Sequence, residues 1–191
     1  MNKKNLFRNL IIFGVLIVID ILLFEFTNCH LAFGPIIISF TLLPIALAAV
    51  YLDTTYAAIF GLIYGMRFFM QEHSFRNKSI IGAVFLFVVS YVALVILLSL
   101  IYKVLIKNDI NRSICSGIVF ALALPLRLCF QKKFILPLFF SMFPTGWLSE
   151  DLYYNTALTW YIPEMITFFI IGFLISFILN KLKNSCLEKY K

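Results

Sequence analysis

Charged and aromatic residues and one amide stand among the apolar stretches of the second half of the sequence. They are Arg127, Trp147, Asn155, Trp160 and Glu164. Indole faces, an amide and charges of both signs suit a polar small molecule with a carboxylate, because a guanidinium can donate two hydrogen bonds to that group. A charged side chain inside a membrane span is costly, and such residues are found mainly at functional positions that face a cavity. The sequence therefore indicates a binding site, although an aromatic belt with interfacial arginines explains each residue singly.

The chain shows none of the motifs that carry catalysis. It contains no GxSxG turn, no HExxH helix, no Walker lysine loop and no Rossmann glycine fingerprint. Its two histidines, His30 and His73, stand in separate polar segments, and its four cysteines have no CxxC spacing. We therefore expect a protein that is not an enzyme and that holds no metal and no bound cofactor. Any uphill transport would need energy from a partner or from an ion gradient.

The composition identifies the environment in which these residues act. The 191 residues are 62% hydrophobic and only 13% charged, whereas a soluble domain is about half apolar and about a quarter charged. This is the composition of an integral membrane protein. The net charge of +7 then reports mainly which loops face the cytoplasm. No basic run with interleaved aromatics stands outside the apolar stretches, so nucleic acid is not an expected partner.

Six apolar stretches predict an all-α fold, because helices satisfy their own backbone groups within lipid. The predicted spans, in a single membrane domain of residues 1–191, are 6–26, 34–52, 56–70, 80–102, 114–130 and 160–179. The stretch 134–143 is too short to cross a bilayer, which favours an interfacial or re-entrant segment. Asp20 lies deep in the first span, and a position near the headgroups and a functional role explain it equally well.

Six spans place both termini on the same side of the membrane. On this topology ten of the sixteen Lys and Arg residues lie on the side of the termini, and six lie on the other side. This excess favours two cytoplasmic termini. The charged and aromatic residues of the candidate site then fall toward the outer side of the membrane.

The segment 36–70 is the centre of this plan. Two apolar runs are joined by a short polar turn at 53–55, and the second run carries Ala57, Gly61 and Gly65 at intervals of four. On a helix these three residues form one smooth surface, which we call the small-residue stripe. In lipid such a stripe lets another helix approach closely. It predicts packing within the bundle or against a partner protein.

This hairpin resembles the second and third helices of the substrate-binding S components of energy-coupling factor (ECF) vitamin transporters. In that family a segment of the form S-F-x-x-L-P-I-A-L precedes a tight turn and a helix that ends in G-L-x-x-G. The matching positions here are Ser39, Phe40, Leu43, Pro44, Ile45, Ala46, Leu47, Gly61, Leu62 and Gly65. Glu164 stands where the family often has an acidic residue opening its sixth helix. The family's first helix commonly docks the coupling subunit through an Ala-x-x-x-Ala pair, for which this chain offers only Gly14.

The resemblance implies a high-affinity binding subunit in the bacterial plasma membrane. Such a subunit captures a B vitamin outside the cell, and the hairpin favours pantothenate or folate over riboflavin. It then associates with the ECF transmembrane coupling protein and two cytoplasmic ATPases, which drive uptake with ATP. The candidate site residues would hold the vitamin-like small molecule.

A structural scaffold is the main alternative. The rod-shape-determining MreD-like subunits are also small, have a similar number of spans and pair a proline-containing helix with a glycine-rich one. They bind protein partners and no vitamin, so an aromatic ligand site beside the last span argues against this interpretation. An intramembrane enzyme is a third class, and the sequence lacks the paired acids or histidines that it needs.

Overall fold

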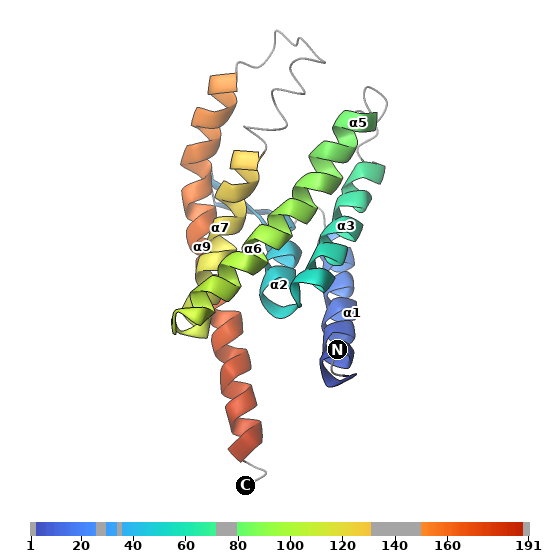
Figure 1. Ribbon diagram of the computed structural model, residues 1–191. Helices are drawn as coiled ribbons and strands as arrows, with labels where there is room; N and C mark the ends of the chain where they lie inside the picture. The colour runs from blue at the N-terminus through green and yellow to red at the C-terminus, as the bar shows by residue number, and fades with distance from the viewer. Residues whose placement is uncertain (1–2, 26–29, 34–35, 72–79, 131–149, 189–191) are drawn as a thin grey trace.

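Six helical segments and one short β-hairpin make up the described part of the chain (Figure 1). The computed structural model describes residues 3–25, 30–33, 36–71, 80–130 and 150–188. Within these residues, four helices are long and apolar enough to cross a membrane. Together with the composition, these helices identify a multi-pass membrane protein.

The elements follow one another in a simple order. Helix α1 spans Lys3–Glu25, and strands β1 (His30–Phe33) and β2 (Ile36–Ser39) pair antiparallel with Phe33 opposite Ile36. The 3-10 turn η1 (Phe40–Leu42) leads into α2 (Leu43–Tyr51), and α3 spans Thr54–Gln71. The fourth segment consists of α5 (Ile80–Ala83), the π-helical turn η2 (Val84–Val89) and α6 (Ser90–Lys107). Helices α7 (Arg112–Phe130) and α9 (Glu150–Glu188) complete the fold.

The helices run between two ends of an elongated bundle. The beginning of α1, the turn from α2 to α3, the connection from α6 to α7 and the end of α9 all lie at one end (Figure 1). We call this the terminal end and the opposite one the far end. The first and last described helices therefore bring the two ends of the chain to the same side of the bundle.

The second predicted span differs from the structure. The sequence predicted a helix over 34–52 in an all-α fold, but Ile36–Ser39 form strand β2 and α2 begins only at Leu43. Pro44 lies in the first turn of α2, where its missing N–H needs no partner, and it disfavours helix in the residue before it. The preceding run of isoleucines is suited to a strand. The fold is therefore helical with one hairpin, and the residues predicted as the second span are part hairpin and part helix.

The other predicted spans fall on helices of the structure. Four of them match α1, α3, the α5–α6 segment and α7 to within a few residues. Helix α9 extends beyond the predicted span 160–179 at both ends, because hydropathy marks only the apolar part of a helix. The predicted interfacial stretch 134–143 lies outside the described residues.

The small-residue stripe of α3 packs against the segment formed by η2 and α6. A methyl group added at Gly61 would lie 2.7 Å from Val95 Cγ1, and one added at Gly65 would lie 2.5 Å from the carbonyl oxygen of Phe87. Ala57, the third member of the stripe, is fully buried. The two helices thus approach so closely that the two glycines have no room for a side chain, which is how small residues bring helices together in lipid.

Helices α7 and α9 are joined by a reciprocal contact of the same kind. A methyl group added at Gly117 of α7 would lie 2.9 Å from the Phe169 ring, and one added at Gly172 of α9 would lie 2.6 Å from the Phe120 ring. Each glycine therefore accommodates an aromatic side chain of the other helix. Gly14 of α1 differs, because a methyl group added there has nothing within 4 Å in the described part of the chain.

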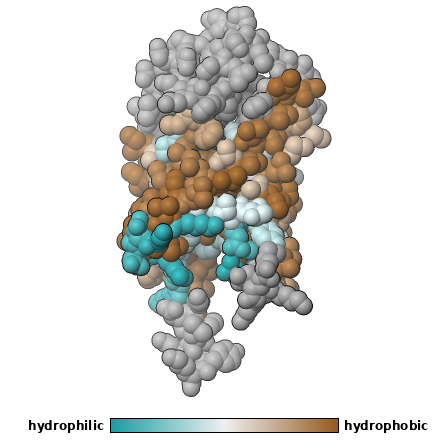
Figure 2. Space-filling model, viewed as in Figure 1, coloured by the Kyte–Doolittle hydropathy of each residue, from teal (hydrophilic) through white to brown (hydrophobic). Residues whose placement is uncertain are grey.

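The core is apolar and lies where α2, α3, α6 and α7 meet. Ile45, Phe60, Leu98 and Val119 are fully buried within it. The outer faces of the helices also carry large apolar side chains, such as Ile170 of α9. Figure 2 shows this apolar surface over the middle of the molecule and polar residues near the terminal end. Lipid is the environment that such an outer surface fits.

Candidate functional site

An ion pair joins α1 and α3 near the far end of the bundle. The Arg67 guanidinium contacts the Asp20 carboxylate, and the two side chains are only 20% and 10% exposed. Two charges inside a bundle are costly unless they are paired. The pairing explains how a carboxylate can lie so deep in the first span. The sequence alone had left open whether Asp20 lies near the headgroups or has a functional role.

Two buried tyrosines, Tyr64 of α3 and Tyr91 of α6, pack against each other. The Tyr64 hydroxyl donates a hydrogen bond to the carbonyl oxygen of Thr41, just before α2. The rings of Tyr64 and Tyr91 meet edge to face with 4.9 Å between their centroids. Tyr64 lies one helical turn before Arg67 on α3, so the two side chains share a face of that helix. We call these residues the far-end cluster: Asp20, Tyr64, Arg67, Tyr91 and Arg127.

Arg127 lies over the face of Tyr91. Its guanidinium carbon is 5.3 Å from the ring centroid, which is a cation–π distance. Tyr91 is 2% exposed, and its hydroxyl is buried without a hydrogen-bond partner among the described residues. A buried hydroxyl is rarely left unpaired in a protein. Tyr91 therefore has an unused hydroxyl inside the bundle, and the Arg127 guanidinium lies over its ring.

Glu164 brings a carboxylate to the interior from α9. It is 5% exposed, whereas Ile162 and Ile166 on either side of it are exposed. One turn later, Phe168 is fully buried and stacks on Phe40 with 6.4 Å between the ring centroids. Glu164 therefore lies on the face of α9 that packs against η1. Strand β2 also contacts α9.

The structure describes the side chains of two of the five predicted binding residues. Arg127 and Glu164 both come from the far half of the bundle, and both are at least partly buried. Trp147 lies outside the described residues, and so do the side chains of Asn155 and Trp160, whose backbones belong to α9. The sequence did not single out the two tyrosines of the far-end cluster, because aromatic residues at helical spacing are also typical of an ordinary core.

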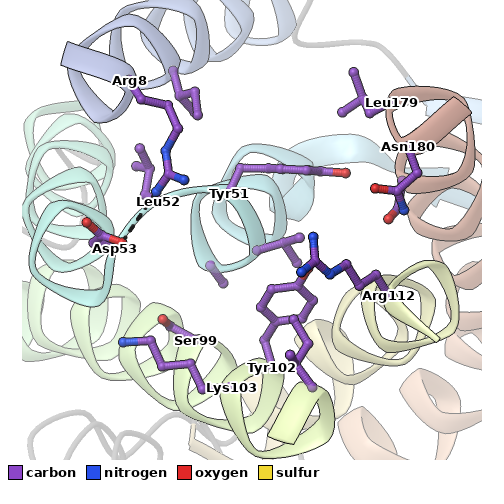
Figure 3. Close-up of a pocket in the computed structure, with 15 residues that line it drawn as sticks. Arg8, Tyr51, Leu52, Asp53, Ser99, Tyr102, Lys103, Arg112, Leu179 and Asn180 are labelled. Carbon is purple, nitrogen blue, oxygen red and sulfur yellow. Dashed lines mark ion pairs between the residues drawn. The ribbon is translucent and has the colours of Figure 1, made fainter. Parts of the chain in front are cut away.

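A second candidate site is a cavity of about 400 Å³ at the terminal end (Figure 3). Three cationic side chains from three helices line it, namely Arg8 of α1, Lys103 of α6 and Arg112 of α7. They share the cavity with one carboxylate, that of Asp53 in the turn between α2 and α3. Sequence reasoning counted these cations only as charge near the termini and loops, because nothing in their spacing shows that they converge.

Side chains of α1 hold Asp53 in place. Asn9 donates a hydrogen bond from Nδ2 to Asp53 Oδ2 at 2.6 Å, and the Arg8 guanidinium lies 3.6 Å from Asp53 Oδ1. Both partners of that ion pair are more than half exposed, so its contribution is small. Lys103 donates instead to a neutral group, the Thr54 hydroxyl, at 2.6 Å. Within the described residues, neither Lys103 nor Arg112 is ion-paired with a carboxylate.

The sequence matches no known protein family, no curated protein and no solved structure. In the part of the chain that the structure describes, no three His, Cys, Asp or Glu side chains come together where they could hold a metal ion. The described residues present a cation, a hydroxyl and aromatic faces at the far end, and a group of cations at the terminal end.

Proposed function

We propose that the protein is the substrate-binding S component of an ECF-type transporter and binds a B vitamin in the far half of the bundle. The observation that carries this proposal is the contact of Arg127 with Tyr91, where a cation and an unpaired hydroxyl lie together. Charge that faces the interior of a membrane bundle commonly marks a substrate site. The resemblance of residues 38–69 to S components supports the same class of protein.

The chemistry of these groups favours a vitamin with a carboxylate. Arg127 can donate two parallel hydrogen bonds to that carboxylate. The Tyr91 hydroxyl can pair with a further polar atom, and Glu164 can accept a hydrogen bond from a hydroxyl or an amide. The rings of Tyr64 and Phe68, which pack on and beside Tyr91, supply apolar walls. Pantothenate and folate carry carboxylates and riboflavin does not, so the first two fit this set of groups better.

The distribution of charge supports uptake from outside the cell. The excess of Lys and Arg near the terminal end favours a cytoplasmic position for that end. The far-end cluster would then lie in the outer half of the membrane, where it meets external substrate. Release to the cytoplasm would require the ECF coupling protein and its two ATPases.

The coupling protein needs a surface that allows close approach. Gly61 and Gly65 do not offer one, because they are in contact with this chain's own residues Phe87 and Val95. Gly14 lies on a face of α1 whose other apolar side chains are exposed, and it is open within the described part of the chain. We therefore assign the docking of the coupling protein to α1 around Gly14.

Mass spectrometry of small molecules released from the purified protein tests this proposal. We expect a B vitamin to co-purify with the wild-type protein and to be much reduced in Arg127→Gln. Lys107→Gln removes the same charge from an exposed position at the terminal end and should retain the vitamin. Co-purification of cell-wall elongation proteins without any vitamin would contradict the proposal and favour the MreD-like scaffold.

A further inference from the structure

The cavity at the terminal end, which the proposed function does not use, gathers charge from distant parts of the chain. Figure 3 shows Arg8, Lys103 and Arg112 entering it from three different helices. The carboxylate of Asp53 is already hydrogen-bonded to Asn9 and lies close to the Arg8 guanidinium. The charges of the other two cations are therefore not compensated by a carboxylate of the described chain. The cavity suits a ligand group with up to two negative charges.

Neutral hydrogen-bond donors surround these cations. The hydroxyls of Tyr51, Ser99 and Tyr102 and the amide of Asn180 belong to the same lining. The Tyr51 hydroxyl lies near two serines but makes no hydrogen bond of normal geometry among the described residues. Hydroxyl, amide, ammonium and guanidinium groups all donate to phosphate oxygens, and a guanidinium can bond two of them at once.

The rest of the lining is apolar. Ile12, Leu52, Ile106 and Leu179 contribute to the wall, and the cavity lies at the end of the bundle where the apolar surface gives way to polar residues (Figure 2). Basic pockets between membrane helices at the cytoplasmic boundary bind lipid headgroups that carry phosphate. An apolar wall beside a group of cations fits a phosphate carried on an apolar body.

We propose that this cavity binds a phosphate group, held mainly by Arg112 and Lys103. Figure 3 shows Asp53 across the cavity from Arg112, which leaves the Arg112 guanidinium away from that carboxylate. The phosphate belongs either to the headgroup of a phospholipid or to a soluble molecule. This site is separate from the far-end cluster, so its test is independent of vitamin binding.

Binding of three probes to the purified protein in detergent tests the proposal. The probes are dioleoyl phosphatidylglycerol, dioleoylglycerol, which lacks the phosphate, and inorganic phosphate. Native mass spectrometry follows the two lipids and thermal shift follows phosphate, at constant ionic strength because salt screens exposed charges. The site variants are Lys103→Gln and Arg112→Gln. Lys107→Gln is the matched control, because Lys107 is exposed on the same helix as Lys103 and does not line the cavity.

We expect phosphatidylglycerol to bind more tightly than dioleoylglycerol, and each site variant to weaken it by about tenfold to a hundredfold while the control binds as the wild type does. Arg112→Lys should retain most of the binding, and unchanged melting temperatures without ligand would show that the variants are folded. Stabilisation by inorganic phosphate alone, lost in the site variants, would support the proposal with a soluble ligand. Two results would overturn the proposal. One is an equal loss of phosphatidylglycerol binding in the site variants and the control, and the other is that the site variants change the binding of neither phosphatidylglycerol nor inorganic phosphate.

Discussion

Replacing Gly65 by alanine should separate two helices that now touch. The added methyl group would lie 2.5 Å from the carbonyl oxygen of Phe87 and 2.8 Å from Val88 Cα. Ordinary contact begins at 3.4 Å, so α3 and η2 would have to move apart by about 0.9 Å at this point. Both neighbours are backbone atoms, and no side-chain rotation can relieve the overlap. Overpacking of this kind costs about 1–3 kcal/mol.

Gly14→Ala is the matched control for this experiment, because nothing lies within 4 Å of a methyl group added at Gly14. Alanine is favoured over glycine in a helix by up to about 1 kcal/mol. This gain is common to both variants, so the difference between their melting temperatures isolates the cost of overpacking. At roughly 2–4 °C per kcal/mol for a chain of this size, Gly65→Ala should melt about 2–12 °C below Gly14→Ala.

Heating in detergent followed by size-exclusion chromatography with fluorescence detection measures both melting temperatures. Gly61→Ala should give an intermediate result, because its nearest neighbour is the Val95 side chain, which can turn away more easily than backbone. Equal melting temperatures for Gly65→Ala and Gly14→Ala would refute the close approach of α3 to the η2–α6 segment.

Three further predictions concern charge, packing and topology. Asp20→Asn should lower the free energy of unfolding by roughly 3–5 kcal/mol, because it removes the carboxylate that pairs with Arg67. Adding Arg67→Gln should restore part of this loss in the same thermal assay, and no recovery in the double variant would argue against the ion pair. Gly172→Ala should also lower the melting temperature, because its methyl group would lie 2.6 Å from an aromatic ring of α7, and an unchanged value would contradict that contact. Cysteines introduced at Asn2 and Asn184 should resist an impermeant maleimide in intact cells, and labelling of either from outside would contradict two cytoplasmic termini.

The sequence predicted most helices correctly because length and hydropathy are properties of one continuous stretch. It misjudged the second span because a short apolar run such as Ile36–Ser39 fits a strand as well as a buried helix. Pro44 was the available signal, since proline is accepted in the first turn of a helix and disfavours helix immediately before it. If the predicted helix had begun at Pro44, the isoleucine run before it could have been predicted as a strand.

The side-chain contacts of the two sites could not be predicted in the same way, because they join residues that are far apart in the chain. Asp20 and Arg67 are 47 positions apart and meet only because α1 packs beside α3. The sequence identified Arg127 as a charge within a span but not Tyr91 as the ring beneath it. The three cations of the terminal-end cavity likewise belong to three helices, and only the arrangement of those helices brings them together.

The affinity of Tyr91→Phe for pantothenate and folate, measured by titration calorimetry beside the melting temperature without ligand, tests the central claim most directly. This change removes only a buried hydroxyl that has no partner among the described residues, so the ligand-free variant should be at least as stable as the wild type. Tyr51→Phe removes a second such hydroxyl at the terminal end and should leave vitamin affinity unchanged. We predict that the wild type binds one of the two vitamins and that Tyr91→Phe weakens binding by about two- to tenfold. Absence of binding by the wild type, or equal affinities of the wild type and Tyr91→Phe, would contradict a vitamin site at the far-end cluster.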